Sequence, residues 1–66
     1  MIKTSCRSFK TDYEVCKFIN LGVECHLDVR VVQICAKDNG FVLFYKGEET
    51  DIDRLNEIFE ADEYVV

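Results

Sequence analysis

Apolar and polar residues alternate along residues 23–31, and this alternation predicts a β-strand. Every second position is apolar: Val23, Cys25, Leu27, Val29 and Val31. A period of two places such residues on one face of a strand and the polar residues between them on the other. Beyond Val31 the alternation stops, because Val32, Ile34 and Ala36 are also apolar. We therefore expect a long strand over residues 23–36 that becomes apolar on both faces.

A second β-rich run, residues 41–45, follows the sequence Asp38-Asn39-Gly40. Asn and Gly tolerate the positive φ angles of tight hairpin turns, and Asp often begins such turns. The two runs are therefore predicted to pair as a hairpin. Phe41-Val42-Leu43-Phe44-Tyr45 is apolar at every position, so the turn end of the hairpin is expected to have two apolar faces.

Two helices are predicted from capping signals and apolar spacing. Thr11 followed by Glu14 forms a capping box, and the apolar stripe after it continues to about Leu21, with Gly22 expected to end the helix. Thr50 repeats the capping signal before a second helix, which is expected from Asp51 to about Glu60.

Residues 2–9 read as a first strand, and Tyr64-Val65-Val66 as a short final strand. The expected order is β-α-β-β-α with that final β, in a single domain over residues 1–66. A right-handed crossover places the first helix on one face of an antiparallel-rich sheet, and the second helix is expected on the same face. This α+β layout resembles a reduced ferredoxin-like plait, a fold that hosts many unrelated functions.

The sheet face without helices is the first candidate interaction surface. It is expected to carry Val32, Ile34 and Ala36 together with residues of the returning strand. A two-residue hairpin loop would add Phe41, Leu43 and Tyr45, whereas a three-residue loop with a bulge would add Val42 and Phe44. Contiguous exposed apolar residues usually mark an interaction site, and a homodimer that packs through this face is one hypothesis.

The negative charge is concentrated near the C-terminal end of the chain, and this segment is the second candidate surface. Residues 1–47 carry seven Lys/Arg and five Asp/Glu, whereas residues 48–63 carry eight Asp/Glu and only Arg54. The balances are therefore +2 and −7. Acidic residues at the start of a helix interact favourably with the helix dipole, but half of these eight acidic residues lie too far along the helix to do so. The candidate partner-binding residues are Glu48, Glu49, Asp51, Asp53, Glu57, Glu60, Asp62 and Glu63.

The four cysteines do not have the spacing of a metal site. Cys6, Cys16, Cys25 and Cys35 are separated by nine, eight and nine residues, whereas structural zinc sites supply ligands in pairs two to four residues apart. We expect Cys6, Cys16 and Cys25 to be reduced and buried as small apolar residues. A cysteine-based zinc or redox protein is the alternative, with Cys35 as its redox candidate.

The sequence does not predict an enzyme or a cofactor. His26 is the only histidine, and the chain has no nucleophile motif, no phosphate-binding loop and no basic-aromatic patch for direct nucleic-acid binding. No signal peptide or membrane span is recognised, so a cytoplasmic location is expected. The leading hypothesis is a small acidic, non-enzymatic module that binds a basic protein surface. In its sharper form it is an inhibitor that occupies a nucleic-acid-binding site, and its composition is similar to that of phage anti-defence proteins.

Overall fold

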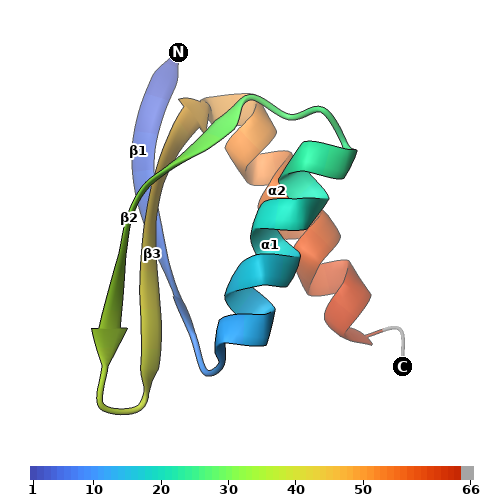
Figure 1. Ribbon diagram of the computed structural model, residues 1–66. Coiled ribbons are helices and arrows are strands. Elements are labelled where there is room, and N and C mark those ends of the chain that lie inside the picture. The colour runs from blue at the N-terminus through green and yellow to red at the C-terminus, as the bar shows by residue number, and fades with distance from the viewer. Residues whose placement is uncertain (65–66) are drawn as a thin grey trace.

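The computed structural model describes the backbone of residues 1–64 and the side chains of residues 1–61. It contains three strands and two helices in the order β1 (Ile2–Phe9), α1 (Asp12–Glu24), β2 (Val29–Lys37), β3 (Gly40–Glu48) and α2 (Glu49–Tyr64). The strands form an antiparallel sheet in the order β1-β3-β2. Both helices pack on one face of the sheet, and the other face has no helix over it (Figure 1). The predicted β-α-β-β-α architecture is confirmed.

The first helix begins as its sequence predicts but ends later. The Thr11 hydroxyl accepts a hydrogen bond from the Glu14 amide at 3.2 Å, which confirms the N-cap. The helix does not end at Gly22, which is buried within α1 against Leu55 of α2. The left-handed residue that follows the helix is instead His26, with φ 56°. Because residues 23 and 24 are helical, the predicted long strand is wrong in its first part, and β2 begins only at Val29.

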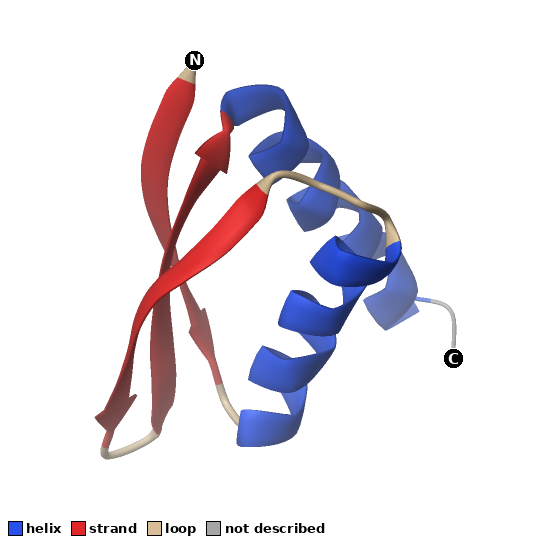
Figure 2. Ribbon diagram, turned by 45° about the horizontal axis from the view of Figure 1, so that its top comes forward, coloured by secondary structure: helices blue, strands red, loops and turns tan. Residues whose placement is uncertain are grey.

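The second helix is also longer than predicted, and it follows β3 directly. It begins at Glu49, so Thr50 lies inside the helix and is not its N-cap. Tyr64 still belongs to α2, which contradicts a final strand at that residue, and Val65 and Val66 lie outside the described residues. Figure 2 shows the two helices side by side on the same face of the sheet.

The core lies between the sheet and the two helices and is rich in aromatic rings. The Phe18 ring lies 5.4 Å from the Phe9 ring, 5.3 Å from the Phe59 ring and 5.3 Å from the Tyr45 ring, measured between centroids. Tilted and edge-to-face pairs at such distances are favourable beyond the area that they bury. The remaining buried core residues are Val15, Leu43, Ile52 and Leu55.

A β-bulge in β2 decides which hairpin residues face the helices. The hairpin has a two-residue loop, Asp38-Asn39, and pairs Ile34 with Leu43 and Ala36 with Phe41. The pairing expected for a two-residue loop is therefore correct. However, the register shifts between Val31 and Gln33. The extra residue moves the positions after it to the opposite face.

The predicted composition of the uncovered sheet face is consequently wrong. Leu43 and Tyr45 are fully buried beneath the helices, and Phe41 packs against that core. Ile34 and Ala36 lie on the same side of the sheet as these residues, because directly paired residues share a face. Val42 and Phe44 occupy the uncovered face instead, which is the alternative that a three-residue loop had implied.

The first strand also has the opposite orientation from the one that its apolar pattern suggests. Arg7 pairs with Leu43 and Phe9 with Phe41, so these residues face the helices. Cys6 pairs with Phe44 and lies exposed on the uncovered face. The prediction that Cys6, Cys16 and Cys25 are buried is wrong, since all three are exposed, and Cys35 is partly buried. Phe9 is the buried residue of β1. Because side chains alternate between the two faces of a strand, the burial of Phe9 decides which face each other residue of β1 occupies.

Candidate functional site

The acidic residues of the C-terminal segment divide into two groups by what they contact. Three of them have a partner within the chain. Glu48 forms an ion pair with the amino group of Met1, the Asp51 carboxylate accepts a hydrogen bond from the Asp28 amide at 2.9 Å, and Glu60 lies 3.4 Å from Arg7. These contacts hold the start of α2 to the loop before β2 and its later part to β1.

Glu48 also affects the protonation of the chain terminus. The hydrogen bond from the Met1 ammonium to Glu48 raises the pKa of that amino group, and the nearby negative charge of Glu49 adds to the effect. The amide of Glu49 also donates to the Met1 carbonyl oxygen at 3.0 Å. Glu48 and Glu49 therefore both help to join the start of β1 to the β3–α2 junction.

The second group is exposed on the outside of α2. We name Glu49, Asp53 and Glu57 the acidic stripe, because successive members are four residues apart and lie about one helical turn from each other. All three side chains are exposed. Within the described residues, Asp53 and Glu57 have no ion pair or hydrogen bond through their side chains. Asp62 and Glu63 continue α2, but their side chains lie outside the described part of the chain.

Arg7 fixes the position of α2 on the sheet. Its guanidinium donates to the side-chain oxygen of Asn56 and lies 4.9 Å from the centroid of the Phe59 ring. Asn56 in turn donates to the Ile52 carbonyl oxygen at 2.9 Å and to the Tyr45 hydroxyl at 3.3 Å. Because Glu60 and Asn56 reach β1, α2 lies over the β1 side of the sheet. Sequence reasoning missed this role, since Arg7 alternates with Ile2, Thr4 and Cys6 as an outward-facing residue would.

The uncovered sheet face carries fewer large apolar side chains than the sequence predicts. Register places Val42 and Phe44 of β3 between Cys6 and Ser8 of β1 and Cys35 of β2. Val42 is nevertheless buried, with 8% of its surface exposed. The face is therefore mixed in polarity, and its exposed large apolar area is limited.

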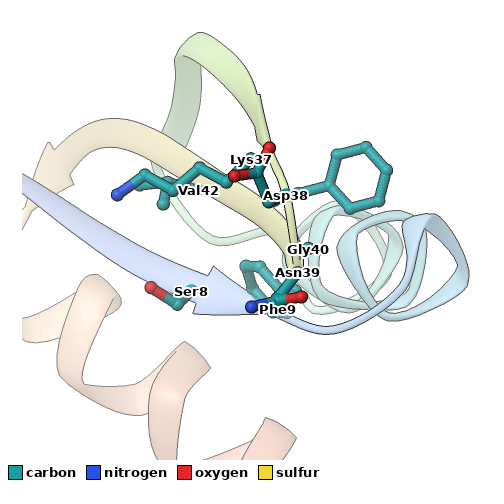
Figure 3. A pocket seen from close by; sticks show the side chains of 8 residues that line it. Ser8, Phe9, Lys37, Asp38, Asn39, Gly40 and Val42 are labelled. Atoms are coloured by element: carbon teal, nitrogen blue, oxygen red, sulfur yellow. The ribbon is translucent and has the colours of Figure 1, made fainter.

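The largest concave features lie at the hairpin end and contain no recognisable catalytic group. A hollow of 320 Å³ lies where Ser8 and Phe9 of β1 approach the hairpin loop at Asn39, and Figure 3 shows the side chains that line it. Lys37 and Asp38 provide its charged groups. His26 lies in the loop after α1 and does not line this hollow. Among the described residues, no three His, Cys, Asp or Glu side chains form a group that could hold a metal ion.

None of the described helices is long and apolar enough to cross a bilayer. Comparison with protein-family models, with curated proteins and with solved structures gives no match to this chain.

Proposed function

We propose that this chain is a non-enzymatic protein-binding module whose acidic stripe occupies a basic surface on another protein. The observation that carries the proposal is the contrast between the two groups of acidic residues in the C-terminal segment, at the end of β3 and along α2. Glu48, Asp51 and Glu60 have contacts that explain them structurally, whereas the exposed carboxylates of Asp53 and Glu57 have none. The partner-binding set expected from the sequence is accordingly reduced, among the described side chains, to Glu49, Asp53 and Glu57.

Charge complementarity at such an interface would increase the specificity and the association rate more than the affinity. Opposite charges across an interface accelerate association and make it sensitive to salt. A partner that normally binds phosphates would offer Lys and Arg side chains to these carboxylates. In that form of the proposal, the stripe competes with a nucleic acid for the same site.

The proposal is tested by reversing the charge of the stripe without disturbing the fold. Asp53→Lys with Glu57→Lys changes the net charge by four units at two exposed positions, and each exposed substitution should alter stability by no more than about 0.5 kcal/mol. The matched control is Glu24→Lys with Asp38→Lys, which makes the same charge change at exposed positions away from α2. Circular dichroism checks that both variants keep the parent fold.

Each protein is immobilised, and proteins retained from an extract of the source cells are quantified by mass spectrometry at about 50 and 200 mM salt, a range over which surface electrostatics weaken strongly. We expect to find a protein that the parent and the control retain equally. The stripe variant should retain at least tenfold less of it, and the higher salt concentration should release it. For that protein in purified form, addition of the parent should displace its nucleic acid if the mimic form is right. If no retained protein distinguishes the stripe variant from the control, the acidic stripe is only a solvated surface.

A further inference from the structure

The outer edge of β2 is not paired with another strand in the described part of the chain. β2 forms its ladder with β3 alone, and Figure 1 shows it as the outermost strand on its side of the sheet. The backbone donors and acceptors along this edge can therefore pair with an additional strand. Soluble proteins usually protect long edges of this kind, so an exposed one indicates a partner or an aggregation risk.

Apolar side chains are exposed beside this edge. Val31, Val32 and Ile34 of β2 retain 45, 55 and 48% of their accessible surface, and Val23 at the end of α1 retains 69%. A small crevice of 40 Å³ between α1 and the sheet is lined by Val23 and Val31, among others. α1 has closer contact with β3 and β1 than with β2, so the helix layer leaves this strip of β2 exposed. An added strand would bury both its own backbone and these side chains.

We propose that the strand which pairs with this edge is β2 of a second copy of the chain. An antiparallel β2–β2 pair about a two-fold axis joins two three-stranded sheets into one sheet of six strands. Both copies then contribute the same residues, so Ile34 of each lies opposite Ala36 of the other on the helix-covered side. Such self-complementarity is what a symmetric dimer interface requires.

The charge distribution favours the β2 edge over the other free edge of the sheet. Two copies that each carry a net charge of −5 repel one another, and α2 with its acidic stripe lies over β1. Pairing through β1 would bring the two acidic helices together. Pairing through β2, which has no acidic residue, places the two β1 strands five strand spacings apart, about 24 Å. This distance is about three Debye lengths at physiological salt, so the repulsion is largely screened.

Two features of β2 limit the strength of the interface. The bulge between Val31 and Gln33 interrupts regular pairing, so the new ladder is expected along residues 33–37, with Cys35 at its centre and Ile34 next to it. Arg30 and Lys37 place positive charges at the two ends of the strand, and such charges weaken edge-to-edge pairing. We therefore expect a dimer that dissociates in the micromolar range, as small interfaces often do.

The experiment measures self-association by sedimentation velocity between about 10 and 500 μM, a range that spans micromolar dissociation constants. Ile34→Lys introduces a charge at a half-exposed position of β2. Thr4→Lys is the matched control, since it adds the same charge to an exposed position of β1, at the opposite edge of the sheet. We expect the parent and Thr4→Lys to dimerise alike and Ile34→Lys to dimerise at least tenfold more weakly, with unchanged circular dichroism.

Two further measurements identify the interface and separate it from other modes of association. Amide hydrogen exchange of β2 in the parent should slow as the concentration rises, whereas that of β1 should not. Dimerisation should persist or strengthen with added salt, because like net charges are screened; a head-to-tail contact of the acidic stripe with basic residues would weaken instead. A parent that remains a 7.7 kDa monomer at the highest concentration, or equal weakening by both substitutions, would overturn the inference.

Discussion

Arg7 is expected to stabilise this fold through the contacts of its guanidinium, and Arg7→Met tests that role. The side chain is mostly buried, with 22% of its surface exposed. Its head group donates to Asn56, lies 3.4 Å from Glu60, and covers the rings of Phe59, Phe18 and Phe9 at 4.9, 5.8 and 5.9 Å. Methionine retains an apolar stem over these rings and removes only the charged group.

The magnitude follows from the separate contacts. A hydrogen bond to a charged group contributes about 1.5 kcal/mol at the low end of its range, which suits a partly exposed site. Stacking of a cation on an aromatic ring adds about 0.5–1 kcal/mol, and the ion pair with the exposed Glu60 adds about 0–0.5 kcal/mol. Allowing for new contacts of the Met side chain, we expect a loss of about 2 kcal/mol in the free energy of unfolding. For a domain of this size the melting temperature should fall by about 8–16 °C.

Thermal unfolding followed by circular dichroism measures the effect, and urea unfolding gives the free energy. Lys3→Met is the matched control, because Lys3 lies on the same strand and the same side of the sheet but is exposed. Its effect should stay within about 0.5 kcal/mol. If the two variants melt within about 3 °C of each other, a difference below about 1 kcal/mol, the proposed anchoring of α2 by Arg7 is refuted.

Two other predictions concern residues whose places were not expected. His26→Gly should raise the free energy of unfolding by about 0.5–1 kcal/mol. The left-handed conformation costs an L-residue about 1–2 kcal/mol, and the greater backbone entropy that glycine loses on folding offsets part of the relief. His26→Ala is the control, and an equal increase in stability with alanine would refute the reasoning. Cys6, Cys16 and Cys25 should react with a thiol reagent in the folded protein almost as fast as in urea, since all three are exposed; peptide mapping that finds them protected until unfolding would contradict this.

The order and type of the five elements follow from the sequence because they depend on local signals, although the same reasoning wrongly predicted a final strand that begins at Tyr64. The Thr11 cap, the Asp38-Asn39 loop and the helical spacing of Ile52, Leu55 and Phe59 act within a few residues of the chain. They correctly predict β-α-β-β-α and two helices on one face of the sheet, but they leave the hairpin pairing open between two loop lengths, and the structure shows Ile34 opposite Leu43. The segregation of acidic residues on α2 is likewise readable without coordinates.

The tertiary structure alone decided which faces are covered. A single bulged residue in β2 moves Ile34 and Ala36 to the helix side of the sheet. No local sequence signal predicts this bulge, because Val31 and Val32 are both suited to either face. The anchor Phe9 turns β1 so that Arg7 covers the aromatic core and Cys6 is exposed, against the apolar alternation of that strand. Helix ends behaved in the same way. Gly22 remains helical because it packs closely against Leu55, and such contacts between distant segments exist only once the chain has folded.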